Sequence, residues 1–303
     1  MYDLTIVGGG PAGAGAAIYA ARKKLKTLLI TDGWGGQSIV SADIQNWIGL
    51  GSITGLDLAK NLEQHVRSYG SDVEIWDTDL AVKVEKKEDH FFLTTKSGKT
   101  LETKIVLVTS GSRRRRLGIP GEDKLDGKGV AWCSTCDAPL FKDMEVAVIG
   151  GGNAGLETVL DLNPYAKKIY LLHRGPALKG DPVTQEKISK MEKVQIILSA
   201  QTQEILGDKF VSGLKYNDKV LPVQGVFIEI GSVPNTEFLG GLVNLNERGE
   251  IIVDHKTQQS SLGGIWAAGD VSDVLYKQNN ISVGDAIKAV LNIYSYLHKE
   301  GHI

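Results

Sequence analysis

Two glycine-rich turns restrict what this chain can fold into more than any other feature. The first, Gly8-Gly9-Gly10-Pro11-Ala12-Gly13, follows the apolar run Leu4–Val7, and the second, Gly150-Gly151-Gly152-Asn153-Ala154-Gly155, follows Val146–Ile149. Glycines at this spacing allow a tight turn, close approach of the backbone to a pyrophosphate, and close packing of the next helix on the strand. One such turn is weak evidence. Two of them, each between a predicted strand and a predicted helix, predict two dinucleotide-binding units.

The likeness between the two copies extends well beyond the turns. Each turn is followed by a predicted helix, a second strand, a charged β-rich meander and an apolar run that ends in Gly-Ser. These elements lie at 11–22, 27–31, 82–103 and 106–112 in the first copy, and at 153–162, 169–172, 202–223 and 226–232 in the second. Asp32, at the end of the second strand, can accept hydrogen bonds from ribose hydroxyls. We therefore expect an α/β fold of two Rossmann-like, three-layer nucleotide-binding domains, each with a parallel sheet plus a small antiparallel β meander.

Length and charge set the broad class of the protein. A chain of 303 residues is long enough for two domains that each bury a core. The 34 basic and 36 acidic residues nearly balance, which does not favour a nucleic-acid surface. No run of about 18 apolar residues occurs, and Met1 leads directly into a strand-like run rather than a signal segment. We expect a cytoplasmic protein that binds neither nucleic acid nor membranes.

The chain has two cysteines, Cys133 and Cys136, with two residues between them. This spacing can close a small disulfide or open to a dithiol, and in a chain with α/β patterning it is typical of a redox pair. The alternative interpretation is that the two cysteines are half of the ligands of a zinc site. A structural zinc needs four ligands, and the chain offers no second cysteine pair, so we expect no metal. In an intracellular protein such a pair is more often catalytic than structural.

Two polar or glycine-rich stretches interrupt the repeated pattern. Arg113-Arg114-Arg115-Arg116 predicts an exposed connector, which is either a solvated surface or a docking patch for an acidic partner. Gly240-Gly241 predicts a second connector. Beyond it, Glu250–Asp254 is strand-like, and Ser282–Lys299 has apolar residues near helical spacing, which predicts a final helix.

Short motifs occur along essentially the whole chain. They are Gly8-x-Gly10-x-x-Gly13, Gly35-Gly36-Gln37, Asn46-Trp47, Cys133-x-x-Cys136-Asp137, Gly150-x-Gly152-x-x-Gly155, Gly231-x-x-Pro234-Asn235 and Gly269-Asp270-Val271. In this order and spacing they resemble the low-molecular-weight thioredoxin reductases, which are FAD-dependent pyridine nucleotide-disulfide oxidoreductases. They are similar also to the C-terminal core of the flavoprotein subunit of alkyl hydroperoxide reductase.

The resemblance implies a homodimeric FAD enzyme built from three segments. Residues 1–113 and 242–303 would form the FAD-binding domain, and residues 114–241 the NAD(P)-binding domain that carries the redox disulfide. Two departures from the family pattern are Ala138 and Asp285, which stand where glycines are usual; neither removes a reacting atom. The implied FAD-binding residues are Gly8, Gly10, Pro11, Ala12, Gly13, Asp32, Gly36, Gln37, Asn46, Gly111, Gly269, Asp270, Lys277 and Gln278.

The family pattern also assigns roles to the redox pair. Cys133 would attack the disulfide of a partner, and Cys136 would face the flavin. Asp137 would protonate a leaving thiolate, although a simple helix N-cap is its structural alternative. The disulfide must meet the flavin, the nicotinamide and a protein substrate in turn, so the resemblance implies rotation of the middle domain about its connectors.

The strand end after Ile169 predicts the choice of nicotinamide nucleotide. His173 and Arg174 directly follow that strand, and Lys179 lies further along the same segment. No acidic residue stands there to accept a hydrogen bond from a ribose 2′-hydroxyl. The NADPH-dependent family members have His-Arg-Arg-x-x-x-Arg here, so one arginine is lost and one is a lysine. We expect a weakened preference for NADPH with measurable use of NADH. The second nucleotide would bind at Gly150, Gly152, Asn153, Gly155, His173, Arg174 and Lys179.

Three alternatives to a reductase that acts on thioredoxin, or on a similar thioredoxin-like or glutaredoxin-like protein, remain open. The same chemistry could supply a peroxiredoxin through a separate dithiol carrier, which would be needed because the chain starts directly at the FAD strand. A ferredoxin-dependent reductase would have a degenerate NADPH site and would use the four arginines for docking. A flavin-binding sensor would need no redox cysteines, and the intact Cys-x-x-Cys-Asp disfavours it.

Overall fold

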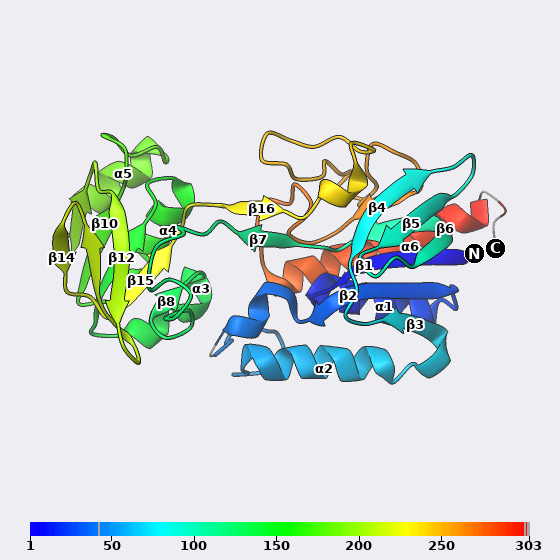
Figure 1. The fold of residues 1–303 in the computed structure, drawn as a ribbon, viewed down its shortest axis with the longest axis horizontal. Helices are drawn as coiled ribbons and strands as arrows, with labels where there is room; N and C mark the ends of the chain where they lie inside the picture. The colour runs from blue at the N-terminus through cyan, green and yellow to red at the C-terminus, as the bar shows by residue number, and fades with distance from the viewer. Residues whose placement is uncertain (42, 300, 302–303) are drawn as a thin grey trace. The chain divides into compact units, whose positions relative to one another are not determined.

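The computed structural model describes residues 1–41, 43–299 and 301, and they form two compact units (Figure 1). Unit 1 comprises Met1–Ile39, Trp47–Arg113 and Val233–Ile303, and unit 2 comprises Val40–Asn46 and Arg114–Ser232. The chain leaves and re-enters unit 1 through two short strands, β7 (Ser112–Arg114) and β16 (Ser232–Pro234), which pair with each other. The re-entry point lies upstream of Gly240-Gly241.

Unit 1 is built on one seven-stranded sheet, in the order β3-β2-β1-β6-β5-β4 with β17 added beside β6. The pairs among β3, β2, β1, β6 and β17 are parallel, and β4 and β5 continue the sheet as an antiparallel meander. The strands are β1 (Tyr2–Gly9), β2 (Thr27–Trp34), β3 (Val73–Trp76), β4 (Ala81–Lys86), β5 (Phe91–Thr95), β6 (Thr100–Val108) and β17 (Ile265–Ala267).

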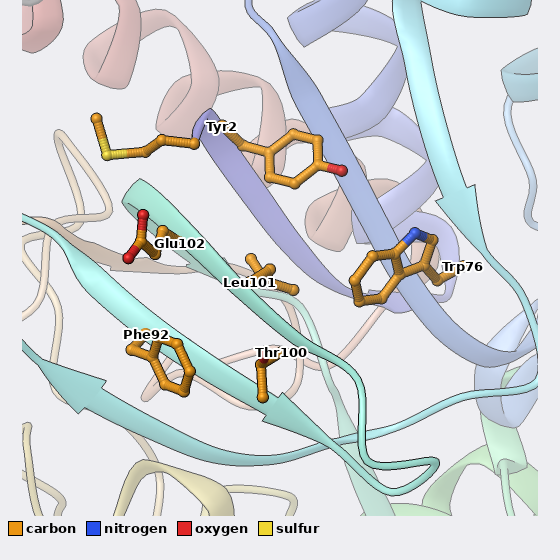
Figure 2. Close-up of a pocket in the computed structure, with 7 residues that line it drawn as sticks. Tyr2, Trp76, Phe92, Thr100, Leu101 and Glu102 are labelled. Carbon is orange, nitrogen blue, oxygen red and sulfur yellow. The ribbon is translucent and has the colours of Figure 1, made fainter.

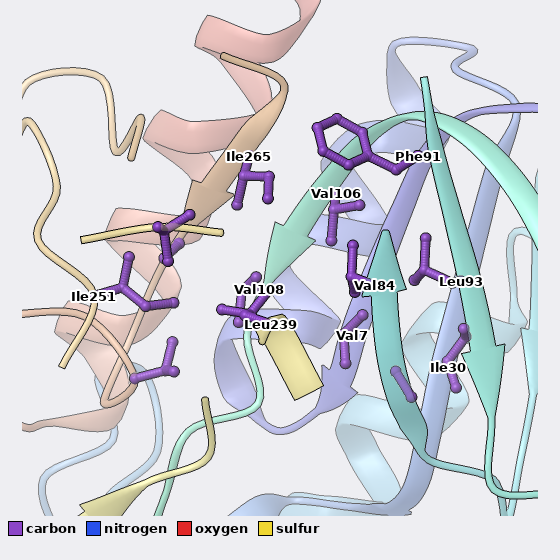
Figure 3. Packing of buried hydrophobic residues seen from close by; sticks show 14 of the residues in the cluster. Val7, Ile30, Val84, Phe91, Leu93, Val106, Val108, Leu239, Ile251 and Ile265 are labelled. Atoms are coloured by element: carbon purple, nitrogen blue, oxygen red, sulfur yellow. The ribbon is translucent and has the colours of Figure 1, made fainter. Parts of the chain in front are cut away.

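The helices that accompany this sheet are α1 (Pro11–Arg22), α2 (Gly55–Arg67) and α6 (Asn279–Lys299), with short 3-10 turns η1 (Gly36–Val40), η2 (Gly70–Asp72) and η4 (Glu237–Leu239). Helix α1 is rich in alanine and glycine because α6 packs closely on it: a Cβ on Gly15 would lie 3.1 Å from Cγ1 of Val283. On the sheet, apolar side chains from distant segments form one buried cluster (Figure 3), including Ile30, Val108 and Ile251. The carboxyl-terminal segment of unit 1 thus completes the core that the amino-terminal segments begin.

Unit 2 repeats the plan with a five-stranded parallel sheet in the order β11-β10-β9-β15-β8, and a separate antiparallel meander β12-β13-β14. Its strands are β8 (Val130–Ala131), β9 (Glu145–Ile149), β10 (Lys168–Leu172), β11 (Val194–Ile197), β12 (Thr202–Gly207), β13 (Val211–Tyr216), β14 (Lys219–Leu221) and β15 (Gly225–Ile228). Its helical segments are α3 (Ser134–Asp137), η3 (Ala138–Phe141), α4 (Asn153–Leu162) and α5 (Pro182–Ser189). The predicted fold class is confirmed.

Two predicted elements differ in detail. The segment Glu250–Asp254 is not a strand; Ile251 and Val253 make single bridges to separate partners, Ile251 with Leu245 and Ser272, and Val253 with Ser260. The final helix begins at Asn279, three residues before the predicted Ser282. Among the residues that the structure describes, none of the helices has the length and apolar character needed to cross a membrane.

Candidate active site

The first glycine-rich turn connects β1 to α1 at the carboxyl end of the parallel strands. A Cβ on Gly13 would overlap the carbonyl oxygen of Gly8, and Gly8 itself has a φ of +115° and faces the carbonyl of Thr109. Only glycine fits either position. The turn therefore brings α1 against the sheet with its first N–H groups directed to the strand ends, where ligands of such sheets bind.

The amino end of α1 has the features of an anion site. Its N-cap, Gly10, supplies no side-chain hydrogen bond, and Pro11 at the first helical position has no N–H to satisfy. Gly36 lies opposite, where a Cβ would be 3.5 Å from the Cα of Gly10. Ala12 is buried and Asp32, at the end of β2, is exposed. This cradle has the form that a dinucleotide pyrophosphate requires, so the residues present fit FAD.

Further predicted FAD residues gather at the same end of unit 1. Gln37 donates from Nε2 to Oγ of Ser112 at 3.1 Å and to Oδ2 of Asp270 at 3.4 Å. Gly269, just before Asp270, has a φ of +76°, and a Cβ there would lie 3.2 Å from Cβ of Ala12. Segments far apart in the sequence, η1 and the end of β17, thus meet beside the turn.

Lys277 is held within the protein. Its Nζ lies 3.0 Å from Oε1 of the buried Glu250 and donates to the carbonyl oxygens of Asp270, at 3.2 Å, and Ser272, at 2.5 Å. The side chain therefore shapes the loop after β17. Gln278 follows in the same loop before α6.

The two remaining predicted FAD residues, Gly111 and Asn46, lie on other segments of the chain. Gly111, with a φ of +63°, precedes β7. Asn46 belongs to the segment Val40–Asn46, which clusters with unit 2 rather than with the turn.

In unit 2 the second glycine-rich turn repeats the same geometry between β9 and α4. A Cβ on Gly155 would overlap the carbonyl oxygen of Gly150, and a Cβ on Gly150 would overlap that of Glu229. Gly152, the N-cap of α4, supplies no side-chain hydrogen bond and has open space around it. β10 lies on one side of β9 and β15 on the other, so the carboxyl ends of β9 and β15 flank the position where strand order reverses.

The loop after β10 wraps around this second turn. Backbone N–H groups of Lys179 and Gly180 donate to the carbonyl oxygen of Gly151 at 2.7 and 3.1 Å, and that of Asp181 donates to Oδ1 of Asn153 at 2.7 Å. Oδ1 of Asn153 thus helps to hold the loop against the turn.

The predicted cations lie on this loop. Arg174 and Lys179 are exposed. The ring of His173 packs under Gly151, and its Nε2 is buried with no hydrogen-bond partner among the described residues. Burial lowers the pKa of His173, and the charges of Lys179 and Arg174 lower it further. The loop therefore presents positive potential that an anion can neutralise.

The two cysteines form a disulfide within unit 2. Their Cα atoms are 5.3 Å apart, and Cys133 is the N-cap of the short helix α3 that contains Cys136. Backbone N–H groups of Cys136 and Asp137 donate to the carbonyl oxygen of Cys133 at 3.2 and 2.9 Å. Both cysteines are half-buried, as a pair that must be reached by a reductant and a substrate requires.

Asp137 is the last residue of α3 and occupies the N-cap position of η3, but its side chain makes no capping hydrogen bond. Burial raises the pKa of its carboxyl to about 6, while the charge of Arg114 opposes this shift. A carboxyl that keeps its proton close to neutral pH beside a disulfide can give that proton to a sulfur.

The arginine run Arg113–Arg116 makes more intramolecular contacts than a solvated connector would. Arg113 donates to Oδ1 of Asn235 at 2.8 Å and Oε1 of Glu237 at 2.6 Å, and Arg114 donates to the carbonyl oxygen of Trp132. Arg116 pairs with two aspartates, Asp126 at 2.9 Å and Asp123 at 3.2 Å. The guanidinium groups of Arg113, Arg114 and Arg116 thus have intramolecular partners, which weakens the prediction of a docking patch.

Sequence reasoning missed three residues around the redox helix. Glu229, directly after β15, has a pKa raised to about 7 by burial, and the buried hydroxyls of Thr158 in α4 and Ser134 in α3 connect it to that helix. An acid directly after an apolar strand was the available signal for Glu229, because strand carboxyl ends form the site.

One surface depression lies away from all of these residues. Its volume is about 360 Å³, and it is lined by Met1, Tyr2 and Trp76 with Phe92, Leu101 and Glu102 (Figure 2). Tyr2 begins β1, so the depression lies at the amino end of that strand and not at the glycine-rich turn. It contains none of the predicted site residues.

Residues 2–288 match the family of pyridine nucleotide-disulphide oxidoreductases. The chain belongs to this family. Membership makes it an oxidoreductase and implies FAD together with a nicotinamide nucleotide, which agrees with the two uncapped helix ends. A thioredoxin reductase from Streptococcus pyogenes MGAS5005 has the same fold, with a TM-score of 0.90 and 32% identity over 99% of both chains.

Longer relatives have higher sequence identity. The chain is 43% identical over 302 residues to a protein named NADH dehydrogenase from Bacillus subtilis, and 42% identical to the alkyl hydroperoxide reductase F subunit of Staphylococcus epidermidis. These matches cover 98% of this chain but only 58% and 59% of the two relatives. The chain thus spans about three fifths of the length of the curated relatives it matches.

Proposed function

We propose that this protein passes electrons from NAD(P)H through FAD and the Cys133–Cys136 disulfide to a thioredoxin-like protein. The observation that carries the proposal is the disulfide itself, formed in a Cys-x-x-Cys helix and followed by the half-buried Asp137, whose pKa is raised to about 6. Relatives of both kinds, thioredoxin reductases and alkyl hydroperoxide reductase F subunits, support dithiol chemistry.

Residues 1–113 and 242–303, which coincide with most of unit 1, form the proposed FAD-binding domain. The backbone of the Gly8–Gly13 turn would hold the pyrophosphate, Asp32 a ribose, and Gln37 with Asp270 the further end of the cofactor. FAD, when bound, supplies the acceptance of hydride and the release of an electron pair. The domain that comprises residues 114–241 would hold the nicotinamide nucleotide at the second turn.

The cysteines account for the transfer to a partner. With the pair reduced, the Cys133 thiolate attacks one sulfur of the partner's disulfide, whose other sulfur leaves and takes up a proton. Cys136 then attacks Cys133 in the mixed disulfide. The partner leaves as a dithiol, and Cys133–Cys136 is again oxidised, so two electrons and two protons have moved. Asp137 is the proposed source of the proton for a leaving sulfur.

Arg174 and Lys179 support use of NADPH, because an exposed guanidinium and ammonium can pair with a 2′-phosphate and no acid stands at this position. The missing second arginine predicts a modest preference. NADH use is supported by the relative named for it.

A second candidate function is supply of electrons to a peroxiredoxin through a dithiol carrier. The observation that favours it is the 42% identity to the F subunit of an alkyl hydroperoxide reductase. Both functions share every step up to the carrier.

Reconstitution with candidate carriers distinguishes the two proposed functions. Protein loaded with FAD is titrated anaerobically with NADPH and with NADH, and then mixed with oxidised thioredoxin, oxidised glutaredoxin or a peroxiredoxin with its carrier. Rapid oxidation by thioredoxin alone supports the first function, and peroxide turnover that requires the carrier supports the second. Protein that folds but cannot take up FAD contradicts both.

A further inference from the structure

A line of oxygen atoms runs from Glu229 to the redox helix. Oγ1 of Thr158 lies 3.2 Å from Oε1 of Glu229 and 3.2 Å from Oγ of Ser134, and Ser134 in turn donates to Oδ2 of Asp161 at 2.8 Å. Ser134 is the residue directly after Cys133, inside the loop that the disulfide closes. The line therefore passes through a residue of the disulfide loop on its way from Glu229 to Asp161.

The protons available to this line can be counted. There are three oxygen–oxygen contacts, but Thr158 and Ser134 contribute only two hydroxyl protons. With both carboxyls ionised, Thr158 either donates to Glu229 or donates to Ser134, and one contact has no proton. A proton on Glu229 completes the series: Glu229 donates to Thr158, Thr158 to Ser134, and Ser134 to the Asp161 carboxylate. Such a chain, in which every donor points the same way, is cooperative.

The burial of Thr158 and the charges around Glu229 both support a proton on Glu229. Thr158 is 2% exposed, so water does not compete for its hydroxyl. The acidic groups Asp161 and Glu157, both on α4, disfavour ionisation of Glu229, whereas Arg114 favours it, and burial raises its pKa to about 7. Arg114 also faces Asp137. The two carboxyls of Asp137 and Glu229 therefore interact with the same guanidinium.

We propose that Glu229 is a positioning residue that holds a proton for the redox pair, and that reduction of Cys133–Cys136 makes it hold that proton more firmly. This inference rests on the proposed function only for the role of the disulfide. Reduction takes up two electrons and two protons, and opens the sulfur–sulfur bond to two thiol groups. Any thiolate formed there adds negative charge next to Ser134, which Thr158 connects to Glu229, and so disfavours the Glu229 carboxylate.

The sign of the effect follows by linkage. If reduction raises the pKa of Glu229, the dithiol is favoured most where Glu229 is protonated in both states, and this advantage is lost as the pH rises through the higher pKa. A shift of one unit corresponds to about tenfold in the equilibrium constant. The Glu229→Gln variant has no titrating proton at this position, and its amide can always donate to Thr158.

The test equilibrates the full-length, FAD-loaded protein with dithiothreitol from about pH 6 to about pH 9, with no nicotinamide or carrier present. Free thiols are trapped by alkylation and counted by mass. The ratio of the wild-type to the Glu229→Gln equilibrium constant is expected to fall about tenfold over this range. Glu157→Gln removes an exposed acid that also faces Glu229 but lies outside the chain of hydroxyls. This variant keeps the titrating proton of Glu229, so its constant, divided by that of Glu229→Gln, should show the same fall as the wild type, displaced to lower pH.

Parallel wild-type and Glu229→Gln profiles would overturn the proposal, and so would a Glu157→Gln profile that matches Glu229→Gln. Thr158→Val, which breaks the chain but keeps the acid, should alter the profile as well. If Glu229→Gln does not fold, infrared difference spectra of Asp137→Asn protein decide: a carboxylic-acid band that grows on reduction near pH 7 supports the proposal, and its absence refutes it. Failure of carrier reduction, by contrast, would contradict the proposed function and leave this equilibrium unaffected.

Discussion

At the scale of single residues, Asp137 is subject to two opposing influences. Burial disfavours ionisation of its carboxyl, whereas the charge of Arg114 favours ionisation, and the resulting pKa is about 6. The protonated acid is the form that can give a proton to a sulfur, so this contribution is complete well below pH 6 and declines as the pH rises through 6.

Asp137→Asn should therefore slow disulfide turnover by about 100-fold, in the usual range for loss of a general acid, and should remove the decline near pH 6. Steady-state turnover of a protein disulfide between pH 5 and 9 measures this. Reduction of the flavin by NADPH in the same variant is the control and should be unchanged. If the variant keeps the wild-type pH profile, another group supplies the proton.

The charge on the loop after β10 gives a second prediction at this scale. Arg174→Ala should raise KM for NADPH about tenfold or more, because a hydrogen bond to a charged group contributes about 1.5 to 3 kcal/mol. KM for NADH should change little, since it lacks the 2′-phosphate. Stopped-flow reduction with both nucleotides makes the comparison within one protein. An equal loss for both nucleotides would show that Arg174 does not contact the 2′-phosphate.

At the scale of elements, the two strand–turn–helix units were predictable because their glycines are forced by backbone overlap, and that constraint is visible as residue type. Ile251 and Val253 show the limit. They belong to the apolar run Ile251–Val253, which is typical of a strand, but their backbone bridges go to separate partners, so no ladder forms. The influence of Arg114 on Asp137 and Glu229 could not be predicted, because the sequence shows it only as one of four consecutive arginines and the interactions depend on the fold.

Substitution of two glycines of the second turn distinguishes an effect on packing from an effect on ligand binding. Gly155→Ala should destabilise unit 2 by about 1 to 3 kcal/mol, because its Cβ would overlap the carbonyl of Gly150. Gly152→Ala has open space and should leave stability almost unchanged, yet weaken NADPH binding by obstructing the pyrophosphate. Urea unfolding and nucleotide titration of both variants provide the measurements. Normal nucleotide binding by Gly152→Ala would move the proposed pyrophosphate site elsewhere.

At the scale of the whole molecule, each unit has its own buried core, so each should respond to its own ligand. FAD at about 1,000 times its Kd should stabilise unit 1 by about 4 kcal/mol, and NADPH should stabilise unit 2 in the same way. Differential scanning calorimetry should resolve two transitions that shift separately. A single transition raised by both ligands would contradict the assignment of one nucleotide to each unit.

The homodimer predicted by the family resemblance belongs to this scale too. Analytical ultracentrifugation of FAD-loaded protein should give about twice the monomer mass of 32.7 kDa. A sedimentation coefficient that stays monomeric at micromolar concentration would contradict it.

The discontinuity of unit 1 bears on the order in which the newly made chain can fold. Most of unit 2 is one continuous stretch, Arg114–Ser232, and is complete before unit 1 has received β17 and α6. Until those arrive, the alanine-rich face of α1 lacks the helix that covers it, and Asp270 is not yet available to Gln37. Unit 2 can therefore fold while unit 1 is still incomplete, and the proposed flavin site can close only after β17 and α6 have been synthesised.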